Sequence, residues 1–235
     1  MATFRSDMTV KLIRHSASDD YVVSAARVST QGDDVLEDLV EDSNRAGLIR
    51  YLMRERHGSP FEHTHFVFYI QAPLFVIREI QRHRMSSFNE ESGRYRQLEP
   101  VFYLPDRDRK LVQVGKPGRY TFEDGTAEQY ELMEVLVRRQ YTAAYDAYTT
   151  MLEAGIAREV ARIVLPLNIY SSMYMTVNAR SLMNFLSLRV GDPEAAHPSN
   201  PQREIEMVAE IMETYFAHLM PLTYAAYEDS RRVAP

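Results

Sequence analysis

The sequence predicts a single globular domain in which helices outnumber short strands. The chain has 235 residues and 45% of them are hydrophobic, which is sufficient for one substantial core. Apolar residues recur at helical spacing along several segments, whereas residues 10–14 and 66–71 have the patterns of strands. We therefore expect residues 1–235 to form one domain of mixed helix and strand.

The first part of the chain is predicted to be mainly scaffold. Residues 10–14 alternate like a half-buried strand, and residues 21–29 form a small-residue helix that ends near Gly32. Residues 36–56 have apolar side chains at helical spacing, which favours one broken helix or two short amphipathic ones.

A turn and a strand follow. Gly58 and Pro60 force a turn within residues 57–65, and the aromatic and β-branched residues 66–71 predict a strand. Pro73 suits the first position of a helix that runs towards Arg84. In such a helix Arg78 and Arg82 lie one turn apart on a single face.

The middle of the chain alternates between irregular and helical segments. Residues 95–120 contain three prolines and predict a long irregular connection. Residues 126–154 predict a helix, with an apolar stripe from Leu132 to Tyr148, that ends at Gly155. Residues 157–165 predict a short helix that Pro166 stops.

Residues 173–190 are predicted to form one helix that is apolar on nearly every side and therefore buried. On that helix Asn178 and Arg189 share one face, and Arg180 and Asn184 share another. Buried polar groups need partners, so the two faces indicate two ligands or two subunits. The alternative is a hydrogen-bond network between helices of one core.

The last part of the chain is predicted to be simpler. Residues 191–201 form a connection broken by prolines, and residues 202–219 form an amphipathic helix. The final residues, 231–235, are expected to be loose.

Composition excludes several classes of function. A net charge of −6 does not favour non-specific binding to nucleic acid or to an anionic membrane. The N-terminal residues lack the apolar core of a signal peptide, and no apolar run approaches a membrane span, so we expect a cytoplasmic protein. With no cysteine, disulfides, thiolate metal sites and thiol nucleophiles are all absent. The phosphate-binding glycine motifs are missing too, so side chains must hold any nucleotide or flavin.

Residues 82–94, R-H-R-M-S-S-F-N-E-E-S-G-R, concentrate chemistry. Arg82 and Arg84 offer planar donors to phosphate or carboxylate oxygens. The polar residues that follow can discriminate a polar ring or a sugar, and they are Ser87, Asn89, Glu90 and Ser92. The segment predicts a nucleotide ligand, and the alternative is an ordinary solvated turn.

The histidine-rich turn at residues 57–65 suggests a rival site. His63 and His65 share one face of a strand, and with His57 and Glu62 they could bind a metal ion. We consider hydrogen-bonded structural histidines more common in such clusters and predict no metal site.

The two polar motifs resemble those of the flavin-dependent thymidylate synthases. Residues 82–94 match R-H-R-x-x-S-x-N-E-x-S-x-R without exception, and the family pattern N-x-R-x-x-x-N with a later arginine is present from Asn178 to Arg189. The resemblance covers essentially the whole chain, starting from A-A-R-V-S at residues 25–29. It implies an α+β fold of the family's own type, with a small sheet, several long helices and a homotetramer whose active sites lie at subunit junctions.

The resemblance also implies a reaction and a set of residues. FAD is the expected cofactor, NADPH reduces it, and methylenetetrahydrofolate supplies the carbon that converts dUMP to dTMP in a single catalytic domain. The residues expected to bind FAD are Ser29, Ser59, Arg82, His83, Arg84, Glu90, Asn178, Arg180 and Asn184. Those expected to bind dUMP are Glu79, Arg82, Glu90, Ser92, Arg94, Arg162 and Arg189.

Arg189 is the expected catalytic residue, because a fixed guanidinium beside the uracil ring can stabilise negative charge without a thiol. Glu79 stands where some relatives have glutamine, and a carboxylate there would repel a ring carbonyl. Two other classes of function are the alternatives. A nucleic-acid-binding module predicts a broad basic surface, and a metal-dependent hydrolase would use the turn at residues 57–65.

Overall fold

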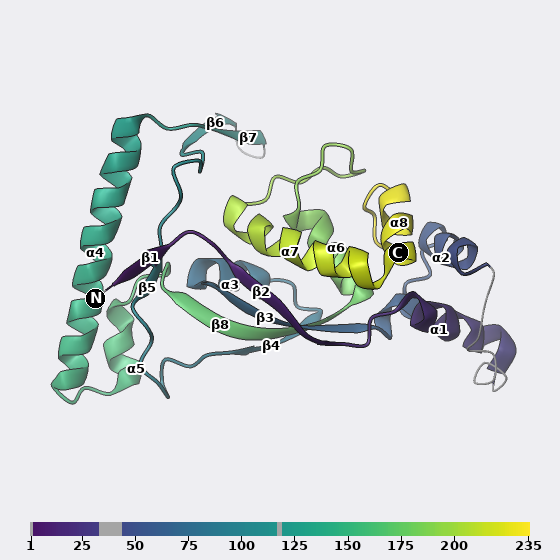
Figure 1. Cartoon of the computed structure of the whole chain (residues 1–235), viewed down its shortest axis with the longest axis horizontal. Helices are drawn as coiled ribbons and strands as arrows, with labels where there is room; N and C mark the ends of the chain where they lie inside the picture. The colour runs from purple at the N-terminus through teal and green to yellow at the C-terminus, as the bar shows by residue number, and fades with distance from the viewer. Residues whose placement is uncertain (1, 33–43, 117–118) are drawn as a thin grey trace. The chain divides into compact units, whose positions relative to one another are not determined.

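The computed structural model describes residues 2–32, 44–116 and 119–235 (Figure 1). Contacts divide the chain into two compact units. The first unit comprises Met1–Asp7, Gln71–Arg78 and Glu90–Ser172, and the second unit comprises Met8–Ile70, Glu79–Asn89 and Met173–Pro235. A single catalytic domain over residues 1–235 stays a prediction.

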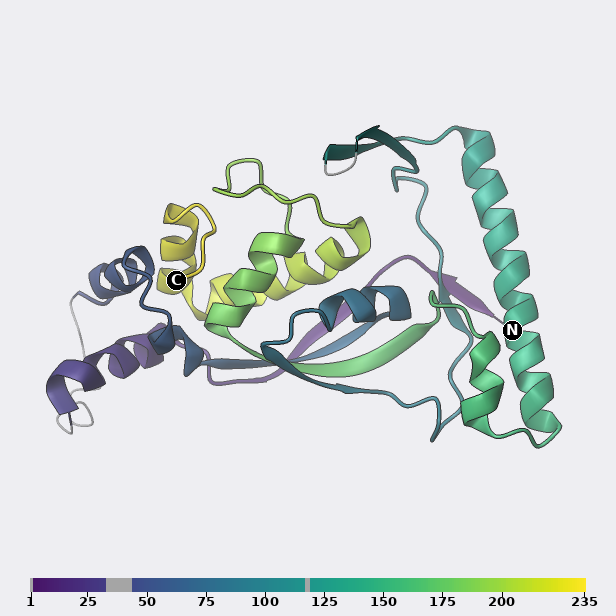
Figure 2. The same ribbon diagram turned by 180° about the vertical axis from the view of Figure 1, so that it is seen from behind.

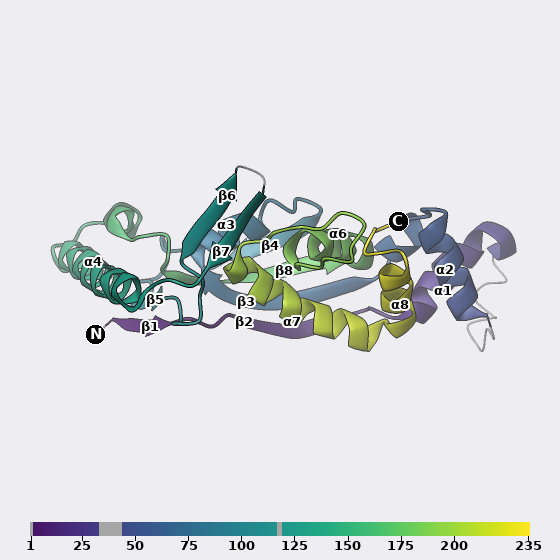
Figure 3. The same cartoon turned by 90° about the horizontal axis from the view of Figure 1, so that it is seen from above.

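A four-stranded sheet has most of its residues in the second unit. Its order is β2 (Thr9–His15), β3 (His65–Pro73), β8 (Tyr170–Asn178) and β4 (Ser86–Glu90). Helices α6 (Ala179–Arg189) and α7 (Arg203–Leu219) lie over one face of this sheet (Figures 1 and 3). Alternate residues of β3, including Phe66 and Phe68, are fully buried, and Phe216 of α7 packs edge-on against Phe66.

Three helices complete the second unit: α1 (Asp19–Gln31), α2 (Arg45–Arg54) and α8 (Pro221–Asp229). The buried carboxylate of Asp19 accepts hydrogen bonds from Leu222 N, Thr223 N and Thr223 Oγ1. These backbone donors belong to the first turn of α8, where a helix has no internal acceptor for them. Asp19 therefore joins the start of α1 to the start of α8.

The first unit contains two small sheets and a long helix. Strand β1 (Thr3–Arg5) pairs in parallel with β5 (Val101–Tyr103), and β6 (Val112–Lys116) pairs antiparallel with β7 (Arg119–Glu123). Helix α4 (Ala127–Glu153) lies beside α5 (Arg158–Ala161), as Figure 2 shows. The core of this unit consists of Leu98, Phe102 and Ile169, with Tyr141 and Tyr145 of α4 packed against it.

Short helices connect these elements. They are α3 (Leu74–Ile80), the 3-10 turn Ser59–Glu62 and the 3-10 turn Arg162–Val164. Among the described residues, no helix has both the length and the apolar character needed to cross a bilayer.

Many local predictions are confirmed. The predicted strands 10–14 and 66–71 lie within β2 and β3, and the predicted helices 21–29, 126–154 and 202–219 correspond to α1, α4 and α7. A capping box between Thr126 and Gln129 starts α4. Of the predicted helical region 36–56, α2 covers Arg45–Arg54, and residues 33–43 lie outside the described part of the chain.

The prediction of one helix over residues 173–190 is wrong. Strand β8 ends at Asn178, and α6 begins immediately after it. The segment looks apolar on every side because it contains two elements. In the strand, burial alternates and Met173, Met175 and Val177 are buried, whereas the helix is buried on one side. Asn178 and Arg189 therefore do not share a helical face, because Asn178 is the N-cap that accepts a hydrogen bond from Ser181 N.

The predicted helix from Pro73 to Arg84 is wrong in extent. Pro73 ends β3, and α3 stops at Ile80. Arg82 N and His83 N donate to the carbonyls of Glu79 and Ile80 in a turn, so Arg78 and Arg82 are not on one helical face. The prediction of an irregular connection over residues 95–120 misses strands β5 and β6 and the start of β7.

The prediction of a loose segment at residues 231–235 is also wrong. Arg232 is 6% exposed and forms ion pairs with Glu213 and Glu228. The backbone of Arg231 and Arg232 bonds to Glu228 O and Tyr227 O.

Replacing Asp19 with alanine should lower the free energy of unfolding by about 2 kcal/mol, because three donors lose a buried acceptor. The matched control is Asp20→Ala, which removes a more exposed carboxylate paired with Arg45 and should cost at most about 1 kcal/mol. Urea denaturation of both variants tests this. Equal effects would contradict the role assigned to Asp19.

Candidate functional site

Arg189, at the end of α6, contacts two residues of the 79–83 segment. Its Nε donates a hydrogen bond to His83 Nε2 at 3.1 Å, and its Nη1 lies 3.6 Å from Glu79 Oε2. The second contact is an ion pair that exceeds hydrogen-bond length. We refer to Glu79, His83 and Arg189 as the Arg189 cluster. It joins the two sequence motifs, since His83 and Arg189 are 106 residues apart.

His83 is neutral in this arrangement. Because its Nε2 accepts a hydrogen bond, its ring proton is on Nδ1. Burial, assisted by the charge of Arg189, lowers the pKa of His83 from 6.5 to about 4. The ring also packs edge-on against Phe185 at a centroid distance of 4.7 Å. His83 therefore orients Arg189 without adding a second positive charge.

Glu79 has a different electrostatic environment. Burial raises the pKa of its carboxyl group, the nearby Arg189 opposes that shift, and Glu204 adds to it. The contact with Arg189 gives Glu79 a partner within the protein. A carboxylate at this position can thus serve to hold the guanidinium of Arg189.

Arg82 and Arg84 lie on either side of His83 and are exposed. Within the described part of the chain, neither guanidinium has an ion-pair or hydrogen-bond partner. Both can therefore donate to an anionic ligand without first breaking an internal pair.

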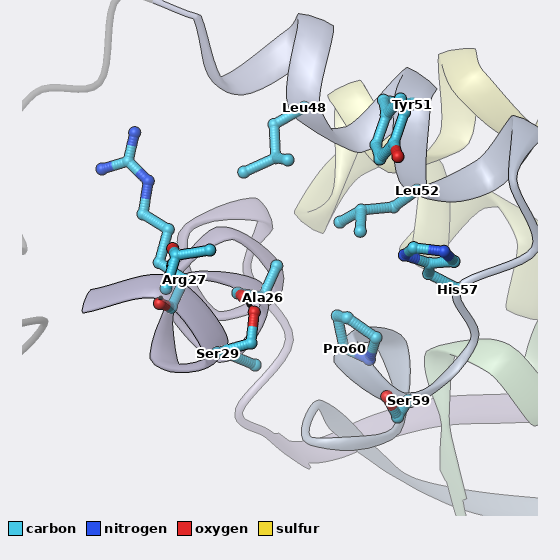
Figure 4. A pocket seen from close by; sticks show the side chains of 11 residues that line it. Ala26, Arg27, Ser29, Leu48, Tyr51, Leu52, His57, Ser59 and Pro60 are labelled. Carbon is cyan, nitrogen blue, oxygen red and sulfur yellow. Dashed lines mark hydrogen bonds between the residues drawn. The ribbon is translucent and has the colours of Figure 1, made fainter. Parts of the chain in front are cut away.

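Ser29 and Ser59 line the same cavity in the second unit, which has a volume of about 640 Å³ (Figure 4). Ser29 lies on α1 and Ser59 on the 3-10 turn Ser59–Glu62, although the two are far apart in the sequence. The volume is in the range of small-molecule sites. The lining residues are Ala25, Ala26, Arg27, Ser29, Thr30, Leu48, Tyr51, Leu52, His57, Ser59 and Pro60.

Sequence reasoning did not identify Tyr51 and Arg27 as lining residues, and it considered His57 only as a metal ligand. The rings of Tyr51 and His57 pack edge-on at 5.8 Å on the wall of the cavity. The proximity of His57 to Ser59 in the sequence was a usable signal. Tyr51 offered none, because it is one aromatic residue of a predicted amphipathic helix.

Arg180 lies in the first turn of α6 and is held by residues outside its motif. Its Nη1 pairs with Glu62, and its Nε donates to Pro235 O at 2.8 Å. Gly58 makes room for it, because a Cβ at that position would lie 2.5 Å from Arg180 Nε. Gly58 immediately precedes the cavity residue Ser59.

Asn178 and Asn184, the other motif residues of this region, have local partners. Asn178 Oδ1 accepts from Ser181 N at 2.8 Å, and Asn184 Nδ2 donates to Arg180 O at 3.0 Å. These bonds stabilise the start of α6. Asn184 is on the exposed side of the helix, where its amide oxygen is open to a ligand.

The remaining motif residues belong to the first unit. Ser92 Oγ accepts a hydrogen bond from Arg94 N at 3.3 Å, and Arg94 Nε donates to Glu159 at 2.9 Å. Glu90 accepts from Ser171 Oγ at 3.0 Å. Arg162 is exposed and, among the described residues, has no side-chain partner.

The turn at residues 57–65 does not assemble a metal site. Across residues 2–32, 44–116 and 119–235, no group of three or more histidine, aspartate or glutamate side chains is arranged to hold a metal ion. His57 instead lines the cavity, and Glu62 pairs with Arg180.

Comparison with known proteins identifies the family. Residues 11–222 match the family described as thymidylate synthase complementing protein. A flavin-dependent thymidylate synthase of Streptomyces avermitilis is 60% identical over 235 residues, covering 99% of this chain and 96% of that protein. One from Tropheryma whipplei strain TW08/27 is 57% identical over 232 residues, covering 99% and 97%.

A solved structure agrees. The crystal structure of a UMP/dUMP methylase PolB from Streptomyces cacaoi bound with 5-Br UMP is 51% identical and covers 100% of both chains with a TM-score of 0.92. The chain belongs to the flavin-dependent thymidylate synthase family. The resemblance inferred from the two motifs, and the mixed helix and sheet fold that it implied, are thereby confirmed.

The buried, neutral His83 should make stability sensitive to acid. Because the pKa of His83 is about 4 in the folded protein and near 6.5 in the unfolded chain, only the unfolded chain gains this proton between those values. Stability linked to His83 is therefore lost as the pH falls from about 6.5 towards 4.

The difference in the free energy of unfolding between the wild type and His83→Gln should decrease as the pH falls from about 6.5 towards 4. Above pH 7 this difference should be constant. The raised pKa of Glu79 makes stability depend on pH in the opposite direction above pH 4.5. Both proteins retain Glu79, so its contribution largely cancels when their free energies of unfolding are subtracted. Urea denaturation at several pH values measures this. A difference independent of pH would show that His83 titrates normally.

Proposed function

We propose that this protein is a flavin-dependent thymidylate synthase that converts dUMP to dTMP. Methylenetetrahydrofolate donates the carbon, and NADPH reduces the bound FAD. The observation that carries the proposal is that both motifs are complete in a chain that is 60% identical to a protein of that name. The whole chain acts as one catalytic domain.

The second unit offers groups that suit FAD. Ser29 and Ser59 line a cavity of about 640 Å³, and the unpaired guanidiniums of Arg82 and Arg84 suit the anionic part of a dinucleotide. The residues that would hold FAD are Ser29, Ser59, Arg82, His83, Arg84, Glu90, Asn178, Arg180 and Asn184. When bound, FAD supplies the reducing equivalents that complete the methyl group.

The residues proposed to bind dUMP are Glu79, Arg82, Glu90, Ser92, Arg94, Arg162 and Arg189. Arg162 can donate to a phosphate, while Ser92 and Glu90 can bond to sugar or base. Ser92 acts as a binding residue and not as a nucleophile.

Arg189 replaces the thiol that this chain lacks. A pyrimidine ring accepts a hydride only if the negative charge that develops on its oxygen and nitrogen atoms is stabilised. A guanidinium that His83 holds in one direction provides this stabilisation with little reorganisation. Arginine remains charged at any working pH, and its planar donors address two ring atoms together.

We further propose a homotetramer with active sites at subunit interfaces. Large apolar side chains are exposed on the first unit, where Leu132 and Val135 of α4 are 60% and 55% exposed and Ile163 is 75% exposed. Apolar surface of this kind is typical of surfaces that another chain covers.

The decisive experiment is formation of dTMP from dUMP by the purified, flavin-loaded protein. Omission of NADPH or of methylenetetrahydrofolate should abolish product. A parallel assay with UMP is informative, because the PolB relative is described as a UMP/dUMP methylase. A colourless protein that forms no product after FAD is added would contradict the proposal.

Arg189→Ala should fold and retain FAD, yet lose about 10²-fold or more in turnover at saturating dUMP. Arg189→Lys should recover little, because a point charge does not reproduce two aligned donors. Arg54→Ala is the matched control, since Arg54 also ends a helix but is exposed, where it pairs with Glu55 and lies over the ring of Tyr51. Near-normal turnover by Arg189→Ala would place the activating group elsewhere.

The double variant Leu132→Asp with Val135→Asp should dissociate the tetramer, because charge on a covered apolar surface is costly. Gln140→Glu changes an exposed polar residue of the same helix and should leave assembly intact. Light scattering after size exclusion measures the mass. A double variant with unchanged mass would exclude this face of α4 from the interface.

A further inference from the structure

Arg232 is buried among three carboxylates of the second unit. Its Nη1 donates a hydrogen bond to Glu228 at 2.7 Å. Its Nη2 lies 2.6 Å from a carboxylate oxygen of Glu213, an ion pair without hydrogen-bond geometry, and its Nε lies 3.9 Å from Asp192. These partners come from α8, α7 and the connection that follows α6. The guanidinium therefore fixes one point of the chain against three separate segments.

The backbone at this point is strained. Arg231 and Arg232 have φ angles of 53° and 61°, in the left-handed region that non-glycine residues rarely adopt. Arg231 is held as well, because its Nε donates to Glu194 O at 3.1 Å. Backbone strain and a buried charge both oppose folding. Their presence here indicates that the path of residues 233–235 is important to the protein.

The segment leads to Arg180. Three residues after Arg232, Pro235 O accepts a hydrogen bond from Arg180 Nε at 2.8 Å. Arg180 lies in the first turn of α6, where the helix dipole disfavours a cation. The carbonyl of Pro235 and the carboxylate of Glu62 compensate for that position.

These contacts leave part of Arg180 available. Within the described residues, the hydrogen bonds of Arg180 engage its Nε and Nη1, and the side chain is 42% exposed. The other guanidinium hydrogens can still donate to a ligand. Gly58 borders the same guanidinium and precedes the cavity residue Ser59.

We propose that residues 231–235 are a positioning element for Arg180, with Arg232 as its anchor. The functional consequence rests on the proposed role of Arg180 in binding FAD. Arg232 itself is a positioning residue, because it acts through the carbonyl of Pro235.

The test is the affinity for FAD of the full-length variant Arg232→Met, measured by flavin fluorescence. Binding should weaken about tenfold, since Arg180 loses one of its two fixed partners. Arg232→Lys should recover part of the affinity. Arg203→Met is the matched control, because it removes another doubly paired arginine, whose partners Glu206 and Glu210 lie on α7, and should leave FAD binding unchanged.

A double variant distinguishes the positioning role of Arg232 from a general loss of stability. In Arg180→Met, the added change Arg232→Met should cause no further loss of FAD affinity, whereas an unrelated structural effect would add to the first. Additive losses would overturn the proposal. If Arg232→Met does not fold, Glu228→Gln removes one of the same partners more mildly and should weaken FAD binding in the same non-additive way.

A crystal structure of Arg232→Met separates this inference from the function on which it rests. The bond from Arg180 Nε to Pro235 O should be broken, and an intact bond would overturn the positioning role regardless of flavin. If the bond is broken and Arg180→Met still binds FAD normally, the proposed flavin role of Arg180 is the part that fails.

Discussion

The hydrogen bond from Arg189 to His83 is the contact on which the proposed chemistry depends. It connects the arginine-rich motif to the motif that ends α6, across 106 residues of sequence. Burial keeps His83 neutral, so the cluster presents one directed positive charge and not two competing ones. In the proposed reaction, this preorganised cation takes the part of the thiol that a chain without cysteine lacks.

Residues outside the motifs do much of the positioning. Arg180 is held by Glu62 and Pro235 and has room only because residue 58 is glycine. Arg189 likewise has Glu79 as a partner. A functional arginine has many rotamers, and its use in a site requires that most of them be excluded.

Local pattern predicted much of the fold, and it singled out the cations of the candidate site. Helices α4 and α7 and strand β3 have clear periodicity, and both motifs are contiguous enough to recognise. The junction of β8 and α6 was missed because no glycine or proline separates them, and the N-cap Asn178 was the only signal. The contacts of Glu79 with Arg189 and of Pro235 with Arg180 were missed because they join distant segments, which local spacing does not encode.

The orientation of Arg189 by His83 is tested most directly by the affinity of the flavin-loaded enzyme for dUMP, measured by calorimetry in a double-variant cycle. In the wild-type background, His83→Leu should weaken dUMP binding about fivefold or more, which corresponds to about 1 kcal/mol. In the Arg189→Met background, His83→Leu should cause no further change. The same loss in both backgrounds would contradict the account, because His83 would then act independently of Arg189.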